Sequence, residues 1–306
     1  MLTRRGAAAV MVLALAASVT ACSSSGGGDG GAAVNVVAST DVYGGIAEQI
    51  AGAQAGKAVR VTALISNPDA DPHSYESNAR SALAVKNADV VIENGGGYDD
   101  FVGALRDSTG TKATVLDAVS ISGKKAPAGG DLNEHVWYDF PTVIKVADDI
   151  AAALVAKDKH HAATYRANAV AFDRSVRALE ATEATIKKAH AGAGVAITEP
   201  VPLYLLQACG LTNRTPAKFS ESIENGTDVP VGVLQQTERL FTGKRVALLA
   251  YNEQTTGAET EKMLTAAKAN HVPVVPVTET LPAGKTYLTW MRSNLDAVEA
   301  ALGHRR

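Results

Sequence analysis

The sequence predicts an α/β protein of two similar lobes, each a parallel sheet flanked by helices, joined by one long α-helix. Short β-branched runs alternate with stretches of helical pattern, which favours parallel sheets covered by helices. These runs are almost entirely apolar, as strands buried on both faces are. The same alternation occurs twice, on either side of a segment without proline or glycine, residues 142–191.

The first lobe is expected over residues 34–141. Its predicted strands are 34–38, 59–65 and 90–92, and its predicted helices are 44–52 and 79–87. The second lobe is expected over residues 193–306, with strands at 195–198, 246–250 and 274–277 and a helix at 260–270. Each lobe therefore has the strands for a small parallel sheet.

Residues 142–192 are predicted to link the lobes. Apolar side chains spaced by four and three form one helical stripe, interrupted by Glu183: Tyr165, Ala169, Phe172, Val176, Leu179 and Ile186. A helix over 158–191 is roughly 50 Å long at 1.5 Å per residue, and would be a stiff hinge. The alternative is a helical hairpin broken near His160.

Residues 1–21 have the pattern of a lipoprotein signal peptide, with Arg4 and Arg5 before an apolar run too short to span a bilayer permanently. The following Val19-Thr20-Ala21-Cys22 resembles a lipobox, which implies cleavage before Cys22 and lipid on its sulfur. Residues 22–33 are rich in Ser, Gly and Ala, and we expect a flexible tether reaching about 18 Å. The alternative is an ordinary secretory peptide with a chance cysteine.

The charge argues against a nucleic-acid-binding protein, and the cysteine content argues against a protein held together by internal disulfides. The chain has 29 basic and 32 acidic residues, and loss of the signal leaves 27 against 32, a net charge of about −5. Nucleic acid is therefore not an expected partner. If Cys22 is lipidated, Cys209 is the one cysteine left and cannot form an internal disulfide.

Two histidines lie in restrained loop segments. His73 follows Pro72, whose ring fixes the backbone just before the imidazole. His135 lies in Asn133-Glu134-His135-Val136-Trp137-Tyr138-Asp139, where an extended backbone would put the imidazole, the indole and Asp139 on one side. Asp139 is then either a hydrogen-bond partner that orients His135 or the N-cap of the next helix.

Two glutamates directly follow predicted strands of the second lobe. Glu199 comes after the strand 195–198, and Glu279 comes after the strand 274–277. Ligands of open α/β sheets collect beyond the carboxyl ends of strands. The joint occurrence of these carboxylates with two restrained histidines indicates a metal site.

The whole mature length resembles the zinc and manganese solute-binding lipoproteins of ABC importers, the TroA and ZnuA type. The matching segments are VVASTDVYGGIAEQIAG, DPHSYE, ADVVIENG, EHVWYD, TEPVPLYLLQACGL and TYLTWMRSNLDAVEAAL. The resemblance implies one ion between the lobes, bound by His73, His135, Glu199 and Glu279. Glu253 is an alternative fourth ligand, because the family more often has an aspartate at the position of Glu279.

The resemblance also implies Zn²⁺ or Mn²⁺ as the cargo and delivery to an ABC permease with a cytoplasmic ATPase. Two imidazoles and two carboxylates favour Mn²⁺, whereas Zn²⁺ binds more tightly to most such sets. Residues 118–132 contain no histidine-rich loop. We expect an extracytoplasmic monomer, anchored to the cell membrane by lipid on Cys22, that is not an enzyme. The alternatives are a metal-dependent surface adhesion lipoprotein and a metallohydrolase with Glu253 as base.

Overall fold

The computed structural model describes residues 33–68, 75–127 and 130–303. The predicted signal peptide, Cys22, most of the tether and His73 lie outside these residues, so the structure does not bear on them. No helix in the described part of the chain combines the length and apolar character needed to cross a membrane.

The N-terminal lobe contains a parallel sheet in the order β2-β1-β3-β4. Its strands are β1 (Val34–Thr40), β2 (Val59–Ile65), β3 (Val90–Glu93) and β4 (Thr114–Asp117). Its helices are α1 (Asp41–Ala51), η1 (Gly52–Gln54), α2 (Ala79–Lys86), α3 (Asp100–Thr109) and α4 (Ala118–Ser122). The three predicted strands are confirmed, and β4 and α3 were not predicted.

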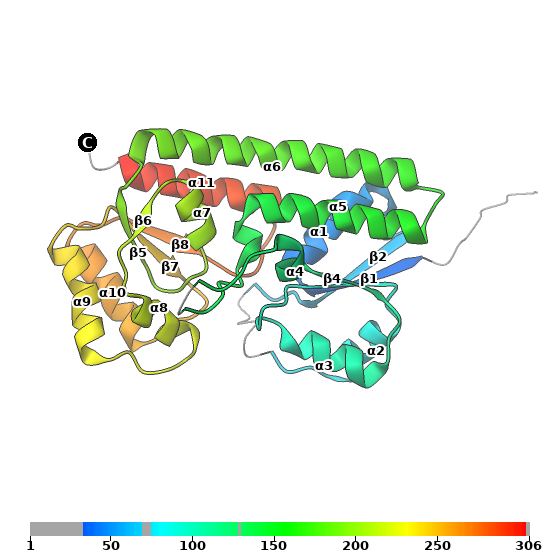
Figure 1. The fold of residues 1–306 in the computed structure, drawn as a ribbon, viewed down its shortest axis with the longest axis horizontal. Coiled ribbons are helices and arrows are strands. Elements are labelled where there is room, and N and C mark those ends of the chain that lie inside the picture. The colour runs from blue at the N-terminus through cyan, green and yellow to red at the C-terminus, as the bar shows by residue number, and fades with distance from the viewer. Residues whose placement is uncertain (1–32, 69–74, 128–129, 304–306) are drawn as a thin grey trace, which may run out of the picture. The chain divides into compact units, whose positions relative to one another are not determined.

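Alternation along the strands supplies both faces of this sheet with apolar side chains. Val36 and Ala38 of β1 belong to the core that includes α1, whereas Val37 packs with Val85 of α2 and Leu105 of α3. Figure 1 shows α2 and α3 on one face of the sheet and α1 on the other. The near-continuous apolar sequence of the strands follows from this burial on both sides.

The C-terminal lobe repeats the arrangement, with a parallel sheet in the order β6-β5-β7-β8. Its strands are β5 (Gly194–Ile197), β6 (Thr212–Asn213), β7 (Leu249–Asn252) and β8 (Val274–Val277). Its helices are α7 (Leu203–Ala208), α8 (Ala217–Glu224), α9 (Val231–Thr242), α10 (Ala258–Ala269) and α11 (Tyr287–Gly303). The strand predicted at 246–250 is β7, which begins three residues later and ends two residues later.

The linking segment is a pair of helices, α5 (Phe140–Lys157) and α6 (Ala162–His190), which follow the 3-10 turn η3 (Val136–Tyr138). The long helix predicted over 158–191 is present as α6, which begins four residues later, and together with α5 it forms the alternative helical hairpin broken near His160. The chain turns because the Asp158 carboxylate accepts hydrogen bonds from the backbone N–H groups of His160 (3.0 Å) and His161 (3.3 Å).

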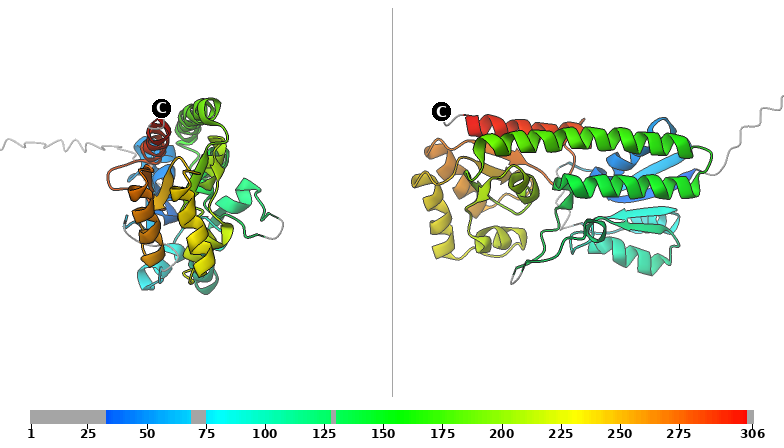
Figure 2. Two further views of the ribbon diagram at one scale, coloured as in Figure 1. Left: turned by 90° about the vertical axis from the view of Figure 1, so that its left-hand side faces the viewer. Right: turned by 45° about the horizontal axis from the view of Figure 1, so that its top comes forward.

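Helix α6 alone runs from the N-terminal to the C-terminal lobe, about 43 Å for its 29 residues. Figures 1 and 2 show it lying beside α5 and α11. All six members of the predicted stripe are buried, and so is Glu183. The fold class is confirmed: two parallel-sheet lobes joined by one long helix.

Glu183 is an acid buried in this linking helix, with 5% of its surface exposed. Its Oε1 has no hydrogen-bond partner among the described residues. Burial, with smaller contributions from Glu180 and Asp139, raises the pKa of Glu183 to about 8 from its ordinary 4.5. The folded protein therefore holds a proton that the unfolded chain releases at lower pH.

The Glu183→Gln substitution should make the protein less sensitive to rising pH. Because the folded-state pKa is raised, the stabilisation from the bound proton is lost as pH rises toward 8. Urea unfolding at about pH 5 and about pH 8 should show a loss of unfolding free energy smaller in the variant by roughly 2 to 4 kcal/mol. The exposed Glu299→Gln in α11 is the control. Equal pH dependence in parent and Glu183→Gln would contradict the assignment.

Candidate metal site

His135 is fully buried immediately before η3. Asn133 holds its ring: the distance from His135 Nδ1 to Asn133 Oδ1 is 2.7 Å, and the backbone N–H of His135 donates to the same oxygen at 3.2 Å. Since an amide oxygen only accepts, Nδ1 carries the proton and Nε2 is left with its lone pair. This tautomer suits metal ligation through Nε2.

Asp139 is an N-cap and does not orient His135. Its carboxylate accepts from the backbone N–H and the hydroxyl of Thr142, and it forms an ion pair with Lys124 at 3.0 Å. The expectation of Asp139 as the partner of His135 was wrong, because residues 136–138 form a 3-10 turn and not an extended strand. Trp137 does wall the site, with its ring centroid 5.1 Å from that of His135.

Glu199 follows β5 and is almost completely buried, with 3% exposed. Its Oε2 has no hydrogen-bond partner among the described residues. Burial raises the pKa of Glu199 to about 9, and the negative charges of Glu224 and Glu279 add to the shift, while Asn252 and Thr255 oppose it. A cation bound to this carboxylate would offset the cost of burying its charge, so the residue fits a metal.

Glu279 follows β8 and is 1% exposed. Its Oε1 accepts a hydrogen bond of 2.9 Å from Asn252 Nδ2, and its backbone N–H donates to Gln254 Oε1. Its Oε2 lies 4.0 Å from His135 Nε2. The structure therefore brings His135 and Glu279 together from two separate loops, and Asn252 interacts with both Glu279 and Glu199.

Glu253, the predicted alternative to Glu279, is exposed. It directly follows β7, whose last residue, Asn252, is fully buried and contacts Glu279. Because successive side chains of an extended chain point to opposite sides, the inward Asn252 leaves Glu253 on the outside. That Glu279 and not Glu253 binds the metal stays a prediction.

The sequence reasoning missed Glu224, the last residue of α8. Its Oε1 lies 3.4 Å from His135 Nε2. Ligand atoms of Glu134, His135 and Glu224 all lie within 4.8 Å of one another, so the three can hold one metal ion. The weak signal in the sequence was an acid at the C-terminal end of a short helix, where negative charge opposes the helix dipole.

A cavity of about 510 Å³ adjoins this group of residues. Among the described residues that line it are four acidic side chains and no lysine or arginine: Asp131, Glu134, Glu221 and Glu224. Residues of both lobes line it, from 96–97 and 131–134 on one side and from 200–225 on the other. The cavity beside Glu134 and Glu224 is therefore rich in acidic side chains.

Hydrogen bonds between the lobes hold the loops that carry the site. Tyr204 donates from its hydroxyl to the carbonyl of Asn133 at 2.7 Å, and Tyr138 donates to the carbonyl of Thr278 at 2.8 Å. Gln254 Nε2 donates to the carbonyl of Pro68 at 2.7 Å. The segments before His135 and Glu279 are thereby placed by contacts with the opposite lobe.

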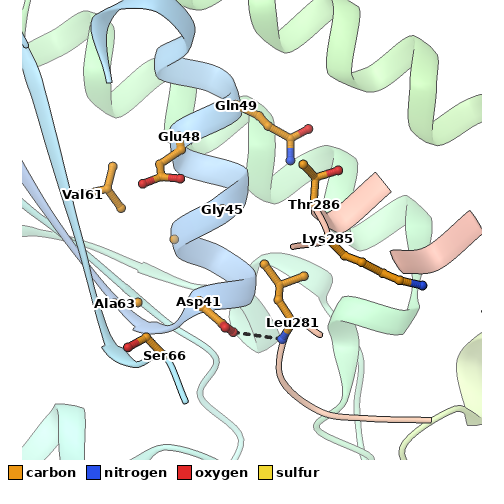
Figure 3. Close-up of a pocket in the computed structure, with 11 residues that line it drawn as sticks. Asp41, Gly45, Glu48, Gln49, Val61, Ala63, Ser66, Leu281, Lys285 and Thr286 are labelled. Carbon is orange, nitrogen blue, oxygen red and sulfur yellow. Dashed lines mark hydrogen bonds between the residues drawn. The ribbon is translucent and has the colours of Figure 1, made fainter. Parts of the chain in front are cut away.

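A separate cavity of about 410 Å³ lies between α1, β2 and the residues before α11 (Figure 3). Asp41 accepts a hydrogen bond from the backbone N–H of Leu281 at 3.1 Å on its wall. A Cβ at Gly45 would lie 3.1 Å from the Leu281 side chain, so the helix approaches this loop closely. The residues described along this cavity include no histidine and none of the predicted ligands.

Comparisons with known proteins agree with this architecture. The family model described as "Zinc-uptake complex component A periplasmic", ZnuA, matches residues 36–301. The iron-binding protein YfeA of Yersinia pestis is 28% identical over 150 residues, 48% of this chain and 46% of that protein, so the chain spans about half the length of this relative. The manganese ABC transporter substrate-binding lipoprotein scaA of Streptococcus gordonii is 24% identical over 294 residues, covering 88% of this chain and 89% of scaA.

Solved structures share the fold. A mutant of the laminin-binding adhesin Lmb from Streptococcus agalactiae has a TM-score of 0.74 at 19% identity, with 88% of this chain and 99% of that chain covered. Identity at this level speaks for the architecture and not for the ligand. Because the family model extends over nearly all of the described sequence, the chain belongs to the ZnuA family.

Proposed function

We propose that this protein binds a divalent transition-metal ion, Zn²⁺ or Mn²⁺, between its lobes and delivers it to an ABC importer. The observation that carries the proposal is the burial of Glu279 beside the Nε2 of the buried His135, with a second buried carboxylate, Glu199, close enough for the charge of Glu279 to raise its pKa. Buried carboxylates at this density need compensating positive charge. A divalent cation supplies it and takes nitrogen and oxygen ligands together.

The proposed ligands are His135, Glu199 and Glu279, with His73 as a fourth from residues that the structure does not describe. In this arrangement the imidazole of His135 donates a lone pair to the ion. The carboxylates of the two glutamates donate oxygens and neutralise its charge. Glu279 is preferred to Glu253 because it is buried in the site whereas Glu253 is exposed.

The proposed setting is outside the cytoplasm, with the body tethered to the membrane by lipid on Cys22 and working with a permease and its ATPase. The names of scaA and YfeA, a manganese transporter lipoprotein and an iron-binding protein, support metal transport. The fold shared with Lmb does not by itself support adhesion. The proposal assigns the protein no catalytic step.

The His135→Ala substitution should lower the affinity for Mn²⁺ and Zn²⁺ by at least a hundredfold, because it removes the one nitrogen donor that the described part of the site offers. Calorimetric titration of chelator-treated protein measures the affinity. His190→Ala, at the end of α6, is the matched control and should leave it within about twofold. Unchanged binding in His135→Ala would rule out the proposed site.

Substitution of the two rival glutamates separates their roles. Glu279→Gln keeps the shape of the side chain but removes its charge, and should weaken metal binding by tenfold or more, since charge-assisted ligation is lost. Glu253→Gln should change affinity by less than about twofold. The reverse ranking in a chelator-competition assay would make Glu253 the ligand.

Metal affinity should rise with pH between about pH 5 and pH 8. The ion competes with protons for His135 and for Glu199, whose pKa of about 9 means that the metal-free site holds a proton at neutral pH. Calorimetry at about pH 7 in buffers of different ionisation enthalpy should show proton release on binding. Constant affinity across this range would argue against ligation by these two groups.

A further inference from the structure

The acid at the end of α8 stands in an electrostatically unfavourable place. Glu224 is the last residue of α8, and the last turn of this helix contains no basic residue. Negative charge at a helix C-terminus meets the partial charges of unsatisfied carbonyls and is destabilising. Asn225 and Gly226, with a φ of +59° at the glycine, turn the chain away directly afterwards. The helix itself therefore does not stabilise a glutamate at this position.

The short distance between the Glu224 carboxylate and His135 gives a reason for a glutamate at this helix end. Glu224 Oε1 lies 3.4 Å from His135 Nε2, closer than Glu279 Oε2 at 4.0 Å. An ion bound at Nε2 is therefore within reach of Glu224 if it is within reach of Glu279. The Nε2 of the buried imidazole thus has carboxylate oxygens of both residues within 4.0 Å.

A second observation points to a cation at the same place. Glu199 is 97% buried, its Oε2 has no hydrogen-bond partner among the described residues, and the negative charge of Glu224 adds to the burial that raises its pKa. Glu199 and Glu224 therefore lie close enough for their charges to repel each other. The cavity beside Glu224 has four acidic residues, and no lysine or arginine, among its described lining residues.

We infer that Glu224 binds the transported ion directly, as an additional oxygen ligand beside His135, Glu199 and Glu279. The inference rests on the proposed metal-binding function and deepens it. The four predicted ligands include two carboxylates, and Glu224 adds a third. The site is then richer in hard oxygen donors. Such a set suits an ion that takes more than four contacts, as Mn²⁺ does, better than tetrahedral Zn²⁺.

The test compares two glutamates of the same helix and the same cavity. In Glu224→Gln the affinity for Mn²⁺ should fall at least tenfold, whereas Glu221→Gln, which removes the same charge three residues earlier, should lower it less than threefold. Glu224→Asp keeps the charge but is one methylene shorter, and should still lose at least threefold. Thermal melting of the metal-free variants checks that each is folded.

Three results would overturn the inference: parent affinity in Glu224→Gln, an equal loss in Glu224→Gln and Glu221→Gln, or parent affinity in Glu224→Asp. The last two would mean that Glu224 acts through its charge alone. His135→Ala, titrated with Mn²⁺ alongside, separates this failure from that of the proposed function. If His135→Ala loses binding while Glu224→Gln keeps it, the metal site stands and Glu224 is not a ligand.

Discussion

The concentration of buried carboxylates around one imidazole is the constraint on which the rest of the molecule depends. Glu199 and Glu279 are nearly inaccessible, and Glu224 lies within 3.4 Å of His135 Nε2. Like charges in a low-dielectric site repel strongly, so such a group persists only if the surrounding structure holds it in place. In the proposed function a bound divalent cation would offset this repulsion, and the unfavourable arrangement of the metal-free site would become the source of affinity.

The scaffold holds this arrangement by joining the lobes. One continuous apolar core includes β1 and α1 of the first lobe, the helices α5 and α6, and α11 at the end of the chain. Tyr287 of α11 donates from its hydroxyl to the carbonyl of Trp137, next to the site, at 2.7 Å. Because the linking helix is part of the core and not a loose hinge, the positions of loops from different lobes are coupled through rigid packing.

Several polar side chains near the proposed metal site support its residues or the helix beside it. Asn133 orients His135, Asn252 and Gln254 hold Glu279, and Asp139 caps α5. Neutral amides as supports leave the site's negative charge on the proposed ligands. They also explain why an acid such as Glu253, adjacent in sequence to two of these supports, lies outside: the alternation of the backbone gives the inner positions to Asn252 and Gln254.

Local pattern was sufficient for much of this protein. Apolar strands with helices between them, the stripe on α6 and the strand-end positions of Glu199 and Glu279 are properties of neighbouring residues, so the sequence by itself determined the fold class and three members of the proposed site. Other features follow from no such pattern. The choice of Asn133 over Asp139 depended on a 3-10 turn, the break at Asp158 on a side-chain cap, and the approach of Glu224 to His135 on the docking of α8 against the other lobe. Only the structure decided these, because the first two depend on the backbone conformation that a turn adopts and the third on a contact between lobes, which spacing along the chain does not specify.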